Sequence, residues 1–508
     1  MPQSQEKGNG PYLVSNHSYG TICGWYNDGT DWKWYGEPSL SEIEDPSFGW
    51  YNTNARDWDN LAVNTPYYLI FKSAGNDRGD THTGAHLVWD SGAWVASTTP
   101  RAPDGTGATN GDGYDCVSTS GTAKNIMTIG AVNDVAGGYN APGDVSMSSF
   151  SGWGPTDDGR IKPDIVANGV GLTSSTNGSD TSYGSSSGTS MSGPSAAGSA
   201  LLLQEHYSET HGSALMLSAT LKALIIHTAD EAGAADGPDY SFGWGLMNTA
   251  TAASVITEDV TNGDVITENT ISNGGTFSTT VCATGNPLVA TIVWTDPAGT
   301  AIGYSLDNTT PNLVNDLDMR LTQGASTYMP YVLNPAIPSA AATTGDNFRD
   351  NVEKIYIPAG SGSYTLTVTH KGALASAQNF SLIVTGISVP TVNNSGVSAI
   401  SGVTSDVCTD VAPQVRFTIK NFACTTNLTS CVVNYQVNGG SVQSFNWTGN
   451  LVPGAEEQVP VLISLAPGAG QSITANTTMP NGLADEDATN DDTSVNFDYN
   501  NFTKICKS

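Results

Sequence analysis

Basic residues are scarce in this chain of 508 residues: 18 Lys and Arg stand against 48 Asp and Glu, giving a formal net charge of −30 at pH 7. A nucleic-acid-binding protein needs a basic surface, so the composition argues against that class of partner. The acidity is typical of solvated surface carboxylates. No stretch resembles the roughly 18 apolar residues of a spanning helix, so we expect no membrane span.

Cysteine pairs with metal-ligand spacing are also missing, because the seven cysteines include no Cys-x-x-Cys motif. Three of them lie close in sequence, and one disulfide among these three is expected in an oxidising compartment: Cys408, Cys424 and Cys431. Buried free thiols are the alternative for Cys23, Cys116 and Cys282.

An export signal is a third absence. The ten residues from Met1 to Gly10 contain no charged stretch followed by an apolar one. The body of the chain, rich in glycine, serine, threonine and asparagine, is nevertheless typical of a secreted extracellular protein. This contrast leads us to expect that the chain begins inside a longer coding sequence.

Short apolar runs alternate with helical patterns in the first half of the chain. Strands are predicted at 11–15, 67–71, 126–129 and 164–167, and helices at 54–63, 195–203 and 214–229. Continuous apolar runs suit a parallel sheet that is buried on both faces. Residues 1–253 are therefore predicted to form a doubly wound α/β domain.

Helical patterns vanish after residue 253, and alternating strands separated by Gly, Pro and Asn turns replace them. We predict two all-β sandwich domains: a jelly-roll-like sandwich over 254–388 and an Ig-like or adhesion-type sandwich over 389–508.

One heptapeptide carries the clearest chemistry: Gly188-Thr-Ser-Met-Ser-Gly-Pro194, directly before a helix rich in small residues. It places Ser190 at a helix N-terminus, where unpaired backbone N–H groups and the positive end of the dipole stabilise an oxyanion. Pro194 is tolerated there because first-turn N–H groups have no helical partners. An ordinary serine cap is the alternative explanation. The complete motif resembles the nucleophile segment of the subtilases.

A second motif, Phe71-Lys-Ser-Ala-Gly-Asn-Asp77, stands at the carboxyl end of a predicted buried strand, where ligands bind in α/β sheets. An asparagine there can donate its amide N–H to an oxyanion, although turn asparagines after glycine are common. Taken in order before the serine motif, it resembles the oxyanion-hole segment of the subtilases. The resemblance implies that Asn76 is the oxyanion donor.

The subtilase resemblance also implies a substrate-binding cleft. Val14 to Gly20 resembles the strand lining one side, and Ser73 to Gly75 would form the facing wall of the specificity site. The resemblance covers about 12–388 and includes the β-sandwich of one subtilase branch. The substrate-binding residues it implies are Ser18, Tyr19, Gly20, Ser73, Ala74 and Gly75.

Subtilases activate the serine with an aspartate and a histidine, from an Asp-Ser/Thr-Gly turn and a His-Gly-Thr segment that both precede the cleft strand. Neither motif precedes the cleft strand here, and the one Asp-Ser-Gly triplet of the chain, Asp90 to Gly92, follows that strand. A serine without a base is a weak nucleophile at neutral pH, so the chain alone is expected to be inactive. Truncation of a longer enzyme is one explanation, and a pseudoprotease acting as a secreted binding or adhesion module is the other.

Acidic residues of the first predicted sandwich are oxygen ligands of the kind that hard cations prefer. Structural calcium, which subtilases often bind, is therefore a hypothesis, with solvated turn carboxylates as the alternative. The candidate ligands are Asp316, Asp318, Asp346, Asp350 and Glu353.

The expected activity is that of a serine endopeptidase that hydrolyses extracellular proteins or peptides. Ser190 would attack the scissile carbonyl, and Asn76 together with the Ser190 backbone N–H would hold the oxyanion. No organic cofactor is expected, and the sequence leaves the oligomeric state open.

Overall fold

The predicted parallel sheet forms the centre of the first half of the chain. In a computed structural model, which describes residues 12–104, 112–388, 391–403, 406–408, 414–463, 465 and 468–502, this sheet has the strand order β1-β4-β7-β8. Its strands are β1 Val14–His17, β4 Leu69–Ser73, β7 Met127–Val132 and β8 Ile165–Asn168. All residues of β4 and β7 are buried, as their continuous apolar sequences predict.

The strands of this sheet run parallel and in a defined register. His17 of β1 pairs with Lys72 of β4, and Phe71 pairs with Met127 of β7. Parallel pairing brings the carboxyl ends of β1 and β4 to the same edge, so the segments that follow the two strands leave the sheet side by side.

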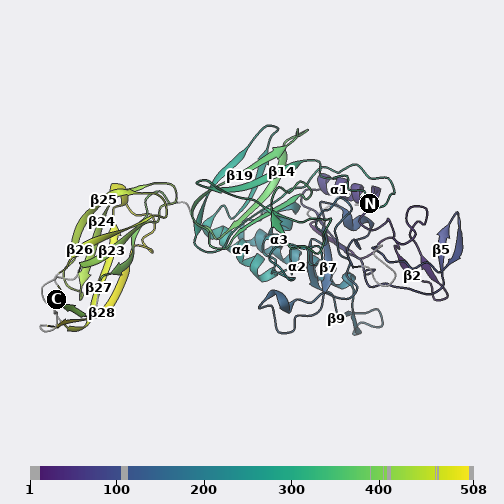
Figure 1. Cartoon of the computed structure of the whole chain (residues 1–508), viewed down its shortest axis with the longest axis horizontal. Coiled ribbons are helices and arrows are strands. Elements are labelled where there is room, and N and C mark those ends of the chain that lie inside the picture. The colour runs from purple at the N-terminus through teal and green to yellow at the C-terminus, as the bar shows by residue number, and fades with distance from the viewer. Residues whose placement is uncertain are drawn as a thin grey trace. The chain divides into compact units, whose positions relative to one another are not determined.

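Helix α2, Thr189–Thr210, packs against all four strands of this sheet and contacts two further helices (Figure 1). The other helices are α1 Thr53–Asn64, α3 Ser218–His227 and α4 Thr249–Asn262. Small residues let α2 approach closely: a Cβ on Gly193 would lie 2.7 Å from the Asn16 side-chain oxygen. The small-residue pattern before three leucines therefore fixes the helix on the sheet.

The sequence did not reveal a second, smaller sheet in this region. Its strands, in the order β2-β3-β5-β6, are β2 Trp25–Asn27, β3 Trp32–Trp34, β5 His86–Asp90 and β6 Ala93–Ser97. The buried side chains of Trp25, Trp34 and Val88 form its core. Because these strands are only three to five residues long, their alternation is too brief to be read from sequence.

Antiparallel strands follow, although α4 crosses the expected boundary at residue 253 and the first of them begins at Ile266. They form two four-stranded sheets, ordered β11-β20-β13-β18 and β12-β19-β14-β15. The bounds are β11 Ile266–Ile271, β12 Phe277–Thr284, β13 Leu288–Val293, β14 Asp316–Gln323, β15 Ser326–Tyr328, β18 Val352–Ile357, β19 Ser361–Lys371 and β20 Gln378–Thr385.

Four short strands complete this part of the chain: β9 Leu172–Ser175, β10 Tyr183–Ser186, β16 Tyr331–Val332 and β17 Thr343–Thr344. The first two form one two-stranded antiparallel sheet, and the last two form another.

The remaining strands form a three-stranded sheet, β21-β23-β26, and a five-stranded sheet, β22-β28-β27-β24-β25. Apolar residues such as Phe417, Val433 and Trp447 are buried together in their core. The bounds are β21 Ser395–Ser401, β22 Asp406–Cys408, β23 Gln414–Asn421, β24 Leu428–Val437, β25 Gln443–Leu451, β26 Glu456–Leu462, β27 Gly468–Thr478 and β28 Thr493–Phe502. The predicted fold class, an α/β domain followed by two all-β domains, is confirmed.

By its internal contacts the chain divides into two compact units. The larger unit comprises Met1–Ser278, Val289–Tyr356 and Leu366–Thr385, and the smaller comprises Thr279–Leu288, Ile357–Thr365 and Gly386–Ser508. The first antiparallel region is thus mostly continuous with the α/β domain.

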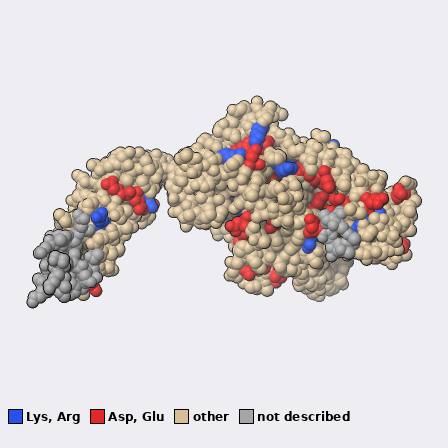
Figure 2. All heavy atoms as spheres, in the orientation of Figure 1, with Lys and Arg blue, Asp and Glu red and all other residues tan. Residues whose placement is uncertain are grey.

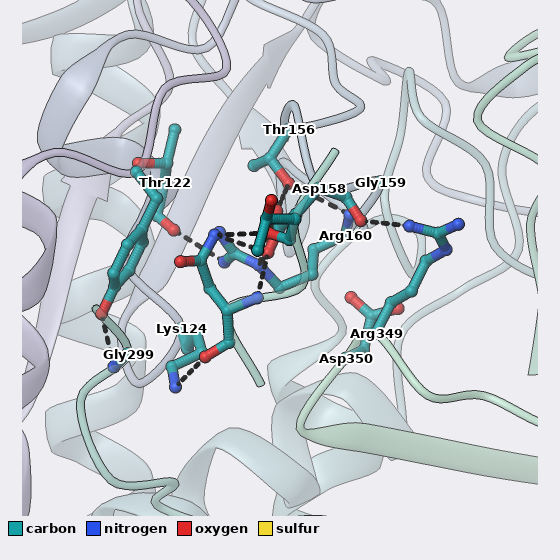
Figure 3. A network of polar contacts seen from close by, with 12 residues as sticks. Thr122, Lys124, Thr156, Asp158, Gly159, Arg160, Gly299, Arg349 and Asp350 are labelled. Atoms are coloured by element: carbon teal, nitrogen blue, oxygen red, sulfur yellow. Dashed lines mark hydrogen bonds and ion pairs between the residues drawn. The ribbon is translucent and has the colours of Figure 1, made fainter. Parts of the chain in front are cut away.

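Within the larger unit, a buried polar network joins the α/β domain to the antiparallel strands (Figure 3). Arg160 donates from Nε to both carboxylate oxygens of Asp158, at 3.0 and 2.9 Å. The same carboxylate accepts two hydrogen bonds from Asn312, from its backbone at 3.1 Å and from its side chain at 3.0 Å. Lys124 forms an ion pair with Asp296 and donates to the Asn312 carbonyl at 2.8 Å. These contacts connect segments more than 150 residues apart in sequence.

The disulfide differs from the prediction. Cys424 bonds to Cys282, 142 residues away, with 5.6 Å between the two Cα atoms. Cys431 is a buried free thiol, and the side chain of Cys408 lies outside what the structure describes. Sequence proximity misled because the fold brings two distant segments of the smaller unit together. Cys23 and Cys116 are buried free thiols.

None of the described helices is long and apolar enough to cross a bilayer. Asp and Glu side chains far outnumber Lys and Arg on the face shown in Figure 2, as the composition requires.

Candidate active site

Ser190 lies in the first turn of α2, as its motif predicts. The helix begins at Thr189, and Gly188 precedes it with a φ of 153°, a conformation that favours glycine. Ser190 is partly exposed. Its backbone N–H belongs to the first four of the helix, which have no intrahelical acceptor, and the positive end of the helix dipole is at the same place. The position therefore suits a hydroxyl whose reaction builds negative charge nearby.

Asn76 is held against the start of this helix. Its Oδ1 accepts hydrogen bonds from the Thr189 backbone N–H at 2.8 Å and from the Thr189 hydroxyl at 2.9 Å. Since the backbone N–H can only donate, the oxygen of the amide must face Thr189, which leaves the Nδ2 donors directed elsewhere. Nδ2 lies 3.6 Å from the point that a Cβ on Gly188 would occupy. The exposed Asn76 side chain thus presents donors beside the nucleophile segment.

The cleft strand contacts the same helix turn. Ser18 donates its hydroxyl to the Ser190 carbonyl at 3.4 Å and accepts from the Asn16 amide at 3.1 Å. Pro194 lies beyond the first turn, at the sixth residue of α2, so the prediction that it occupies a first-turn position is wrong. Because Pro194 has no N–H, the carbonyl four residues earlier lacks its helical donor, and Ser18 takes that role.

The other predicted substrate-binding residues flank this contact. Tyr19 and Gly20 follow β1 and are exposed, with 64% of Tyr19 accessible. Ser73 ends β4, and Ala74 and Gly75 connect it to Asn76. The two segments leave parallel, neighbouring strands at the sheet edge where Ser190 and Asn76 meet. The fold therefore brings segments that lie more than 100 residues apart in sequence together in one site.

No histidine activates Ser190 within the residues described, which include all seven histidines of the chain. His17, on the cleft strand, hydrogen-bonds the Ser15 hydroxyl at 2.8 Å and the Tyr19 hydroxyl at 2.6 Å. Burial, followed by the charge of Lys72, lowers the pKa of His17. His17 therefore belongs to a local hydrogen-bonded group rather than to the nucleophile.

The remaining histidines lie elsewhere. His82 and His86 pack against Trp25 in the small sheet, and His206 and His211 contact α4 residues. His227 is buried between two threonine hydroxyls, and His370 accepts from the Gly274 backbone N–H. Each of these side chains is committed to a structural contact.

The carboxylates predicted as calcium ligands divide into two sets. Asp316, Asp318 and Asp346 converge on Lys371, which lies 3.2, 2.9 and 2.7 Å from them, and Arg320 contacts two of the three. Two protein cations thus already offset most of the charge of these three carboxylates.

The other two predicted ligands bind backbone N–H groups instead: Asp350 accepts from Ile161 at 2.8 Å and Glu353 accepts from Met319 at 2.5 Å. The five residues do not share one coordination centre, and calcium binding stays a prediction.

A different set of acidic side chains comes together, and no Lys or Arg of the described residues forms an ion pair with it. Oxygens of Glu44, Asp115 and Asp307 lie within 4.8 Å of one another. Asp157 joins them, because its Oδ1 and that of Asp115 lie 2.0 and 2.4 Å from the point that a Cβ on Gly49 would occupy. Burial, followed by the charge of Asp307, raises the pKa of Asp157 to about 8. Burial, followed by the charge of Asp157, raises the pKa of Asp115 well above its usual value.

Comparison with known proteins identifies the first half of the chain. Residues 5–245 match the family described as Subtilase family. A segment of 61 residues, 12% of the chain, is 51% identical to the C5a peptidase of Streptococcus pyogenes serotype M18 and covers 5% of that protein. A longer alignment, over 315 positions that cover 47% of the chain, is 25% identical to the serine protease/ABC transporter B family protein tagB of Dictyostelium discoideum and covers 16% of it.

Among solved structures, the patellamide maturation protease PatA matches 40% of this chain and 56% of its own, with 18% identity and a TM-score of 0.27. The aligned segments thus span a small part of the length of the curated relatives and about half of the PatA chain. The family match covers the helix that carries Ser190, the turn that carries Asn76 and the segment after β1 that carries Ser18. Residues 5–245 therefore form a subtilase-family region of this chain.

Proposed function

We propose that Ser190 and Asn76 form the nucleophile and the oxyanion hole of a serine endopeptidase acting on extracellular proteins or peptides. The observation that carries the proposal is the double hydrogen bond from Thr189 to Asn76 Oδ1, which orients the amide N–H donors beside Ser190. In an acyl transfer, negative charge develops on the substrate carbonyl oxygen as the serine oxygen attacks. The Asn76 amide and the Ser190 backbone N–H would stabilise that charge.

Residues 12–502 on their own are proposed to be inactive or nearly so. All seven histidines hydrogen-bond or pack elsewhere, so nothing described takes the proton from Ser190. Turnover would require a histidine and an aspartate brought to the Ser190 hydroxyl. Oxyanion stabilisation and substrate binding remain without them, as removal of the other triad members from subtilisin shows.

A peptide boronic acid tests the site without requiring turnover. Addition of the Ser190 oxygen, with its proton released to water, converts trigonal boron to a tetrahedral anion that mimics the transition state. Boron-11 NMR distinguishes the two forms. We expect a tetrahedral adduct with the wild type and none with Ser190→Ala. In subtilisin, loss of the oxyanion-hole amide costs roughly 10²–10³-fold in turnover, so Asn76→Ala should weaken the adduct about tenfold or more.

The competing hypothesis is a non-catalytic binding or adhesion module that uses its β domains. The contacts of the histidines favour this hypothesis, because they leave Ser190 without a general base among the described residues. This hypothesis predicts no boronate adduct, and ligand capture that Ser190→Ala does not change. Hydrolysis of casein by the wild type, abolished by Ser190→Ala, would contradict the proposed inactivity and leave the peptidase assignment standing.

A further inference from the structure

Lys72 is an exception among the buried lysines of the described residues. Four lysines are at most 3% exposed, and three of them form ion pairs with carboxylates: Lys124 with Asp296, and Lys162 and Lys222 with Asp164. Lys72 forms none within 4.0 Å in the described part of the chain. Its Nζ donates only to the backbone oxygen and the hydroxyl of Ser73, at 2.9 and 3.1 Å. An ammonium has three N–H donors, so one is left for another acceptor.

The Lys72 ammonium lies close to the cleft strand. Lys72 Nζ lies 3.9 Å from the point that a Cβ on Gly20 would occupy, and the Ser118 hydroxyl lies 4.0 Å from the same point. Gly20 belongs to the segment whose Ser18 bonds the Ser190 carbonyl, and Ser73 begins the segment that ends at Asn76. Two polar side-chain atoms therefore lie close to the Gly20 backbone, two residues from the Ser18 contact with the nucleophile segment.

Lys72 is mostly cationic at neutral pH. Burial lowers the pKa of Lys72 to about 8, and the charge of Asp77 acts in the opposite direction. The Asp77 carboxylate, whose pKa burial raises to about 6, makes no ion pair with Lys72. Burying an ammonium without a carboxylate is costly, and a ligand carboxylate would remove that cost.

We infer that Lys72 selects substrates with an acidic side chain, glutamate above all, on the acyl side of the scissile bond. This inference rests on the proposed function, because that function places the scissile carbonyl between Ser190 and Asn76. The side chain next to that carbonyl then enters between the segments 18–20 and 73–75. A glutamate carboxylate at that place would accept from Lys72 Nζ and the Ser118 hydroxyl.

Three peptide boronic acids that differ only in the acyl-side residue test this assignment: glutamate, the isosteric glutamine, and leucine. We expect the glutamate compound to bind wild-type protein about 10- to 100-fold more tightly than the glutamine compound, as a charge-assisted hydrogen bond implies. In Lys72→Met that ratio should fall to about one, and binding of the leucine compound should be kept or improved.

Lys354→Met is the matched control. Like Lys72, Lys354 forms no ion pair within the described residues: it donates to the backbone carbonyls of Ile226 and His227, and burial lowers its pKa to about 8. Its replacement should resemble Lys72→Met in its effect on the melting temperature and leave the glutamate-to-glutamine ratio unchanged.

The outcomes distinguish a wrong substrate preference from a wrong assignment of the peptidase function. Adducts that require Ser190 but favour leucine over glutamate would overturn the acidic preference and leave the peptidase proposal intact. An unchanged glutamate-to-glutamine ratio in a folded Lys72→Met would also overturn it, because another group would then read the carboxylate. Absence of any adduct on Ser190 would overturn the proposed function and this inference together.

Discussion

Two groups of acidic side chains in the larger unit differ in how their charge is balanced. Asp158 is held by Arg160, the Thr156 hydroxyl and Asn312 (Figure 3). Burial alone would raise the pKa of Asp158, but Arg160 beside it lowers that pKa below the usual value. Among the described residues, the group of Glu44, Asp115, Asp157 and Asp307 has no such partner, and one buried oxygen on each of Asp115 and Asp157 accepts no hydrogen bond there. Loss of water around a carboxylate thus ends in a raised or a lowered pKa, depending on the partners that the fold supplies.

Removing the cation that pairs with Asp158 should have the largest effect on the free energy of unfolding. Arg160→Met leaves the Asp158 carboxylate buried without a cation, and should lower the free energy of unfolding by about 3–5 kcal/mol. Urea denaturation followed by tryptophan fluorescence measures this. The double variant with Asp158→Asn should recover part of the loss, because the buried charge is then gone. A loss below about 1 kcal/mol would show that the pair contributes little.

Calcium should have the next largest effect if the predicted ligands bind it. Excess calcium at about 100 times its dissociation constant would stabilise the fold by about 2.7 kcal/mol, visible as a rise in melting temperature over a chelator control. Asp318→Asn should abolish that rise. If Asp157→Asn instead abolishes the rise, the ion binds at the group of Glu44, Asp115, Asp157 and Asp307. If the melting temperature of the wild type does not rise, the calcium hypothesis is wrong.

Asp157→Asn should stabilise the metal-free protein, in contrast to the first variant. The folded pKa of Asp157, about 8, lies above its unfolded value of about 4. The folded state therefore binds the extra proton between these values, and the wild type loses stability as pH rises through this window. The variant should gain about 1–3 kcal/mol over the wild type at pH 8.5 and nothing near pH 4. An advantage that is independent of pH would contradict the assigned titration.

An exposed pair gives the smallest effect. Arg56 and Asp57 lie 2.7 Å apart on α1, with side chains 39% and 59% exposed. Solvent screens such a pair, so Arg56→Ala should change the free energy of unfolding by less than about 1 kcal/mol. A larger change in urea denaturation would mean that short distance alone, rather than burial, sets the energies compared above.

Much of the fold followed from local patterns in the sequence. The apolar run before Lys72 predicted β4, and the small residues after Gly193 predicted the close approach of α2 to the sheet. The Cys282–Cys424 disulfide and the small Trp-rich sheet could not be predicted in this way. Both depend on contacts between distant segments, for which neither periodicity nor local spacing carries information.

The sequence by itself determined the chemistry available near Ser190: a hydroxyl at a helix start, an amide at a strand end and a family that combines them. Only the tertiary structure decided which oxygen of this site each donor meets and that Ser18 replaces the N–H missing at Pro194. It also decided that no carboxylate of the described residues forms an ion pair with Lys72. The reason is physical: residue type fixes which bonds a side chain can make, whereas parallel strand pairing and helix packing fix which partners lie within 3.5 Å of it.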